Sequence, residues 1–163
     1  MKELEKLDGS SQVVVCLMAT KIIQYTRLKE LCKKAKVISF FIFWFLIFFK
    51  SDEQILSQLE KCGILISGCW VVKSESMKLQ PKTIIGRNYI LSLLHQNGIV
   101  SRKEIQEKTD LKMEEIKDIL SDICIINDKK MWQLKLKPDE KFMKHFPEIV
   151  YEQNKLWKKR IEL

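Results

Sequence analysis

Cysteine and histidine are the residue types in this chain that could bind a metal ion or supply a nucleophile and its base. The two histidines, His95 and His145, lie fifty residues apart, and no two cysteines have the spacing of a zinc finger. None of the five glycines forms a phosphate-binding loop. We therefore expect reduced core thiols, no catalytic residue, no metal and no cofactor, which favours a binding or assembly module over an enzyme. The cysteines are Cys16, Cys32, Cys62, Cys69 and Cys124.

The surplus of lysine and arginine also has chemical consequences. The 163 residues carry a formal charge of +8, and the excess lies at the two ends, with +5 over residues 1–50 and +3 over residues 135–163. A basic chain attracts polyanions such as nucleic acids. The alternative is an ordinary lysine-rich surface in contact with water, and the sequence leaves both interpretations open.

Helix and strand patterns occur in the same order twice. Apolar residues spaced by three and four, with capping boxes at 51–54 and 101–104, predict three helices in each half. Two β-prone runs follow each set, at 64–72 and 124–134. Three helices and a hairpin make a winged helix, so we predict a mainly α fold with small β-hairpins (α+β), in which C-terminal helices follow tandem winged-helix domains.

The predicted units are small, near the lower limit for an independent core, so we expect them to pack on each other. Phe142, Phe146 and Trp157 are expected to fasten the terminal helices to the second unit. The predicted boundaries are 1–9 for a frayed leader, 10–74 for the first unit, 75–82 for a linker, 83–136 for the second unit and 137–163 for a C-terminal helical extension.

An apolar insert at residues 37–50 interrupts the first unit and holds six of the eight phenylalanines of the chain. A membrane span needs about 20 apolar residues, so we expect no membrane association. Joining Lys36 to Ser51 would restore an ordinary unit. Codons for Val37 to Lys50 can begin with GT and end with AG, and phenylalanine codons can be T-rich. We therefore hypothesise a retained intron read in frame; if translated, it is an aggregation hazard.

The third helix of a helix-turn-helix usually enters the major groove, where phosphate contacts need lysine or arginine. Here both third helices, at 52–61 and 112–122, carry a net charge of −2. We therefore predict that neither reads bases and that protein contacts carry the function. Weak, sequence-independent DNA or phosphate contacts have other candidates: Arg27, Lys29, Lys33, Lys34, Lys129, Lys130, Lys158, Lys159 and Arg160.

Large aromatic side chains are the candidates for packing or partner contacts. Trp70 and Trp132 fall on equivalent hairpin strands of the two units, and we expect core packing for both. Phe142, Phe146 and Trp157 complete the set.

Several short motifs resemble those of a known family, in the same order along the chain. Residues 68–74 resemble its GNWVVKS segment, residues 86–89 its GRDF, and residues 142–150 its FIKKHPDVV. The family is the RNA polymerase III-specific subunit that forms the TFIIF-like heterodimer, in its animal form. The resemblance covers that family's C-terminal tandem winged-helix region, and the N-terminal dimerisation half is absent from this sequence, which suggests a fragment, a truncated gene model or a divergent paralogue.

What the resemblance implies is a nuclear, non-catalytic subunit of DNA-directed RNA polymerase III. The family supports assembly, initiation and termination in the transcription of tRNA and other short RNAs. The expected partners are other polymerase III subunits, with weak DNA contact and no small-molecule substrate. The alternative is a free-standing winged-helix DNA-binding regulator of transcription.

Overall fold

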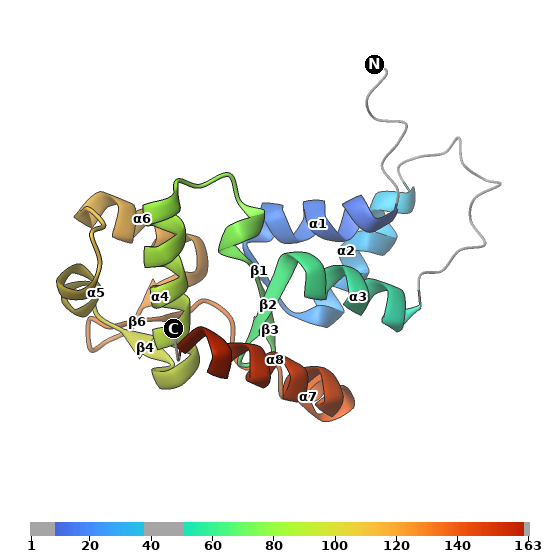
Figure 1. Cartoon of the computed structure of the whole chain (residues 1–163). Helices are drawn as coiled ribbons and strands as arrows, with labels where there is room; N and C mark the ends of the chain where they lie inside the picture. The colour runs from blue at the N-terminus through green and yellow to red at the C-terminus, as the bar shows by residue number, and fades with distance from the viewer. Residues whose placement is uncertain (1–8, 38–50, 162–163) are drawn as a thin grey trace, which may run out of the picture.

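The computed structural model describes residues 9–37 and 51–161 (Figure 1). In the first unit three helices pack around one hairpin, and a short extra strand follows the first helix. Its elements are α1 (Gly9–Thr20), β1 (Ile22–Ile23), α2 (Tyr25–Val37), α3 (Asp52–Cys62), β2 (Gly63–Ile66) and β3 (Cys69–Val72). The predicted leader and apolar insert lie outside the described residues, apart from their junctions with α1 and α2.

The second unit repeats this order, and two helices follow it. A 3₁₀ turn, η2 (Ser74–Ser76), joins the units. The elements of the second unit are α4 (Pro81–Asn97), β4 (Ile99–Val100), α5 (Arg102–Lys108), α6 (Met113–Ile123), β5 (Cys124–Ile126) and β6 (Trp132–Leu134). The C-terminal helices are α7 (Glu140–His145) and α8 (Pro147–Ile161). The first two residues of α4 fall inside the predicted linker, because Pro81 is well suited to the first position of a helix.

Each unit contains a small antiparallel sheet of three strands. The first sheet has the order β1-β3-β2 and the second has the order β4-β6-β5. The predicted class, mainly helical with small β-hairpins, is confirmed. The strand β1, whose two residues pair with Val71 and Trp70, is not predicted by the sequence patterns. The winged-helix assignment and the division of the chain into units stay predictions.

The helix ends follow from local sequence. Ser51 accepts from the Gln54 backbone while the Gln54 side chain accepts from Ser51, so the predicted capping box begins α3. Ser101 Oγ caps α5 by accepting from the backbone of Glu104 at 3.1 Å. Gly98, with φ of 72°, ends α4 in the left-handed conformation that favours glycine.

The first sheet is buried on both faces, as its continuous apolar runs allow. Trp70 and Leu65 face a core made with α1, α2 and α3. Ile64 and Val71, on the opposite face, belong to the core that contains the apolar side chains of α4. The two units therefore share a core across this sheet, and their predicted packing on each other is confirmed.

The C-terminal segment returns to the first unit. Phe142 lies 5.3 Å from Tyr25 and 6.0 Å from Trp70 between ring centroids, and Phe146 lies 5.5 Å from Tyr25. The expectation that both phenylalanines fasten the helices to the second unit is therefore wrong, because their aromatic partners belong to the first. Figure 1 shows α7 and α8 running below β2 and β3, with the end of α8 beside α4.

The turn of the first hairpin contacts the chain segment that leads back to the first unit. The amide of Asp139 donates to the carbonyl of Ser67 at 3.0 Å. A Cβ on Gly68, whose φ is 77°, would come within 2.6 Å of the Asp139 carbonyl. Glycine is therefore required at this position both by the turn and by the chain that crosses it.

Candidate functional site

The groups that could do covalent or metal chemistry are buried or dispersed. Among residues 9–37 and 51–161, no three histidine, cysteine or acidic side chains are arranged to hold a metal ion. Burial raises the pKa of the Cys69 thiol to about 11 and that of Cys124 to about 12. Both thiols are therefore protonated near neutral pH, and neither is an activated nucleophile. None of the helices in the described ranges is long and apolar enough to cross a membrane.

The basic candidates form three separate groups. Figure 1 places α2 and β6 on opposite sides of the molecule, so the lysines of α2 and those of the second hairpin do not share one surface. The third group lies at the end of α8. The candidates whose side chains are exposed to solvent are Arg27, Lys33, Lys34, Lys129, Lys130, Lys158 and Lys159.

Three of the basic candidates form ion pairs within the chain. Arg27 pairs with Glu30 at 2.9 Å, and Lys29 pairs with Asp52 of α3. Arg160 is half-buried and lies 3.3 Å from Glu75. Arg27 stays exposed beside Glu30, whereas Lys29 and Arg160 are half-buried as well as paired, so these two are the least available to an external anion.

The two equivalent tryptophans are core residues. Trp70 is fully buried and Trp132 is 7% exposed. Trp70 pairs with Ile23 and Leu65, and Trp132 holds the same place in the second sheet. The expectation of core packing is confirmed for both.

Trp157 joins the two units. Its Nε1 donates to the carbonyl of Leu65 in β2 at 2.7 Å, and its ring stacks on His95 of α4 with centroids 4.7 Å apart. One turn earlier in α8, Gln153 Oε1 accepts from the Leu65 amide at 3.1 Å. Thus α8 satisfies both backbone groups of one edge-strand residue while covering α4.

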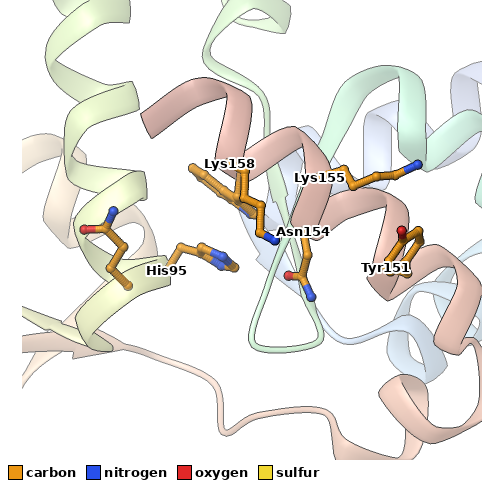
Figure 2. Close-up of a pocket in the computed structure, with 7 residues that line it drawn as sticks. His95, Tyr151, Asn154, Lys155 and Lys158 are labelled. Carbon is orange, nitrogen blue, oxygen red and sulfur yellow. The ribbon is translucent and has the colours of Figure 1, made fainter. Parts of the chain in front are cut away.

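A shallow hollow of about 460 Å³ lies beside this contact, between the end of α4 and one face of α8. Figure 2 shows His95 and Lys158 close to its centre and Tyr151 at its far end. Burial lowers the pKa of His95, so its imidazole is neutral near pH 7. The lining residues are His95, Gln96, Tyr151, Asn154, Lys155, Trp157 and Lys158.

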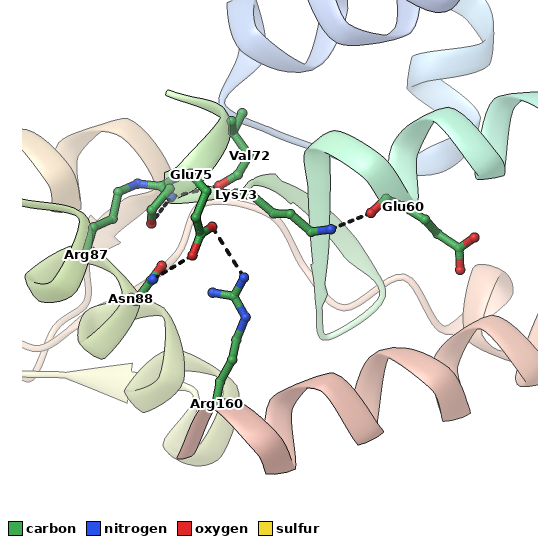
Figure 3. Close-up of polar contacts among 8 residues, drawn as sticks. Glu60, Val72, Lys73, Glu75, Arg87, Asn88 and Arg160 are labelled. Atoms are coloured by element: carbon green, nitrogen blue, oxygen red, sulfur yellow. Dashed lines mark hydrogen bonds and ion pairs between the residues drawn. The ribbon is translucent and has the colours of Figure 1, made fainter. Parts of the chain in front are cut away.

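A polar network fixes the junction between the units (Figure 3). Arg87 of α4 is 3% exposed and donates to the Val72 carbonyl at 2.7 Å and to Ser74 Oγ at 2.9 Å. Burial lowers the pKa of Arg87 to about 10. Glu75 accepts from Asn88 of α4 and from Arg160 of α8. Both helices are therefore tied to the segment that follows β3.

Comparisons with known proteins bear on what this arrangement is. A family model described as RPC5 protein matches residues 1–163. The chain belongs to the RPC5 family. It is 29% identical over 168 residues to the DNA-directed RNA polymerase III subunit RPC5 of Mus musculus and equally so to that of Homo sapiens. Each match covers 96% of this chain and 24% of the relative, so the chain spans about a quarter of the length of these relatives.

The RPC5 match confirms the family resemblance seen in the motifs, and the structure gives those motifs physical roles. In residues 68–74, Gly68 admits the crossing chain, Trp70 fills the core and Ser74 accepts from Arg87. In residues 86–89, a Cβ on Gly86 would lie 2.4 Å from a Leu111 methyl carbon, so any larger residue there would force the Leu111 side chain to move. These motifs join the two units and admit the chain segment that leads to α7.

Sequence reasoning missed the polar residues of this junction as a group. Arg87 and Gln153 are buried polar side chains whose partners are distant in sequence. A polar residue inside an apolar helix pattern is the signal that could have found Arg87, because such a group needs hydrogen-bond partners when buried. The distance in sequence between Gln153 and Leu65 left no comparable signal.

Proposed function

We infer that this chain serves as a non-catalytic part of DNA-directed RNA polymerase III in the nucleus, where it supports assembly, initiation and termination in the transcription of tRNA and other short RNAs. The observation that carries this proposal is the RPC5 match over residues 1–163, together with relatives that are named as polymerase III subunits. The partners and the activity of the full-length relatives are assigned to this chain as part of this proposal.

Protein contacts are the mode of action that the charges favour. The outward side chains of α6 include Glu114, Asp118 and Asp122 against Lys117, so this helix repels phosphate. In α3, Glu53 is exposed, and Asp52 already pairs with Lys29. A helix that reads the major groove needs the opposite sign.

The free-standing DNA-binding regulator is the less supported alternative. It would require one basic surface that places several lysines along a duplex. The basic candidates instead form three groups, of which two lie on opposite sides of the fold. Lys29 pairs with Asp52 of α3 and Lys82 pairs with Glu115 of α6, but each helix still presents exposed carboxylates to solvent.

Co-purification from nuclei tests the proposal. The full chain, tagged at one end, is expressed in human cells, and nuclear complexes are recovered at physiological salt. We expect polymerase III subunits in the eluate in near-stoichiometric amount. Trp157→Ala removes the contact between α8 and β2 while leaving the surface lysines in place, so it should recover less polymerase III if the folded arrangement makes the contact. Recovery of the chain from nuclei without any polymerase III subunit would favour the regulator.

A further inference from the structure

The two sheets have the same register, so each residue of the first sheet has a defined equivalent in the second. Trp70 pairs with Ile23 and Leu65, and Trp132 pairs with Val100 and Ile126. One position away, Val71 pairs with Ile22 and Ile64, and Gln133 pairs with Ile99 and Ile125. The equivalent pairs are therefore Ile22 with Ile99, Ile64 with Ile125, and Leu65 with Ile126.

The outer face of the first sheet is covered by helices of the same chain. Ile22 is 5% exposed and Ile64 is 1% exposed, and both belong to the core shared with α4 and Trp157. Their equivalents lie open. Ile99 is 40% exposed and Ile125 is 47% exposed, and the half-buried Gln133 lies between them. The same surface is thus occupied in one unit and unoccupied in the other.

The edge of the sheet shows the same difference. At Leu65, the α8 side chains Gln153 and Trp157 bind the backbone amide and carbonyl that point away from β3. In the second sheet, the Lys135 amide donates to the Ile123 carbonyl and the Asn127 amide donates to the Met131 carbonyl. Hydrogen-bonded and non-hydrogen-bonded residue pairs alternate along an antiparallel ladder, so Ile126 and Trp132 form a non-hydrogen-bonded pair. The Ile126 amide and carbonyl therefore also point away from β6. The Ile126 side chain is 55% exposed, and among residues 9–37 and 51–161 no helix covers it as α8 covers Leu65.

Two features define what would fit this surface. The first unit supplies the template, in which Trp157 of the amphipathic helix α8 lies in the core on this face. Gln153 and Trp157, one turn apart, offer amide and indole groups to the edge. The second feature is charge. The hairpin of residues 124–135 carries Lys129, Lys130 and Lys135 against Asp128, a net charge of +2. An acidic flank on the incoming helix would complement it.

We propose that the outer face and edge of the second sheet, formed by Ile99, Ile125 and Ile126, bind an acidic amphipathic helix of another RNA polymerase III subunit. The binding mode is that of helix α8 on the first sheet. This proposal rests on the proposed function and specifies where the polymerase is contacted.

The test uses the full chain and RNA polymerase III purified from human cells depleted of RPC5. We expect Ile125→Glu and Ile99→Glu each to weaken binding of the chain to this polymerase by about ten-fold, because each places a charge in a desolvated contact. Ile85→Glu is the matched control, since Ile85 is 71% exposed on α4, outside this surface. The Ile85→Glu variant should bind the polymerase within about two-fold of wild type.

A photo-crosslinking amino acid at position 125 identifies the occupant and does not depend on a disruptive variant. Crosslinks to an acid-flanked segment of a polymerase subunit, at positions spaced by three and four residues, support the proposal even if the glutamate variants lose their fold. Crosslinks to every second residue of a segment, which indicate a strand and not a helix, overturn the proposal. Crosslinks to a second copy of the chain or to DNA overturn it as well. Equal binding by wild type and both folded variants overturns the docking surface and leaves the proposed function standing. No binding by wild type overturns both.

Discussion

Trp157 Nε1 and the carbonyl of Leu65 lie 2.7 Å apart, although 92 residues separate them in sequence. Leu65 is on the edge strand of the first sheet, and its amide is bound from the same helix by Gln153. The contact therefore makes α8 the cover of a strand edge that would otherwise be open to water or to another chain. Because the Trp157 ring also stacks on His95 of α4, this one side chain holds both units.

Trp157→Phe should destabilise the fold through the lost hydrogen bond. Phenylalanine preserves most of the ring contact with His95 but leaves the buried Leu65 carbonyl without its donor, at a cost of about 1–3 kcal/mol. Urea unfolding followed by circular dichroism measures this change. Tyr151→Phe is the control, because Tyr151 is 63% exposed on the same helix and its hydroxyl should contribute within about 0.5 kcal/mol. Equal losses in the two variants would contradict the assigned role.

Arg87→Met tests the junction between the units. Methionine retains an apolar stem but removes both donors, which leaves the Val72 carbonyl and Ser74 Oγ buried without their partner. Removing a buried charge also recovers desolvation energy. We expect the unsatisfied acceptors to dominate and the free energy of unfolding to fall by about 2–3 kcal/mol. The exposed Arg102 offers a control, Arg102→Met. An Arg87→Met variant as stable as wild type would show that desolvation is the larger effect.

Asp52 gives the first unit a pH dependence. Hydrogen bonds from Lys29 and then from Tyr25 lower the pKa of Asp52 below its usual value. A carboxyl with a depressed pKa stabilises the folded state above its unfolded pKa, about 3.9, and this contribution is lost as pH falls through the folded pKa. Wild type should therefore be more stable than Asp52→Asn at pH 7, and the difference should shrink below about pH 4.

Denaturant unfolding at a series of pH values measures the Asp52 contribution. Glu53→Gln provides the control for the loss of one negative charge in the first turn of α3. If the difference in the free energy of unfolding between wild type and Asp52→Asn stays constant from pH 7 to pH 2.5, the ion pair with Lys29 does not account for that difference.

The sequence predicts the elements whose signal is local. Capping residues at Ser51 and Ser101 and the stop at Gly98 begin and end helices where expected. The hairpins follow from β-prone runs around short turns. By contrast, β1 has two residues and no periodic pattern, and it is a strand only because β3 pairs with it from far along the chain. Its discovery required the tertiary structure.

The candidate site was less predictable for the same reason. Short motifs indicated the family, and the two tryptophans were correctly placed in the core. The side to which Phe142 and Phe146 turn depends on how the segment after β6 crosses the Gly68 turn, which no local pattern encodes. Likewise, the exposure of Ile99 and Ile125 becomes informative only beside the buried pair Ile22 and Ile64.

The retained-intron hypothesis for residues 37–50 concerns the transcript. We expect mature messages of this gene to lack these 14 codons and to join the codon of Lys36 to that of Ser51. Sequencing of full-length mature messages measures this, and the ends of the other introns of the gene are the control. Mature messages that retain the 14 codons as the major form would contradict the hypothesis and make the apolar run a real part of the protein.

Weak DNA contact is the last expectation to test. If the exposed lysines bind phosphate, duplex DNA should be retarded at low salt without regard to sequence, and log K should fall linearly with log salt. Replacing Lys129 and Lys130 with alanine should reduce that slope by about 2. The control pair is Lys103 and Lys108, exposed on α5 and outside the three basic groups. If wild type retards no duplex at low salt, or if the control pair loses as much, these lysines are ordinary solvated side chains.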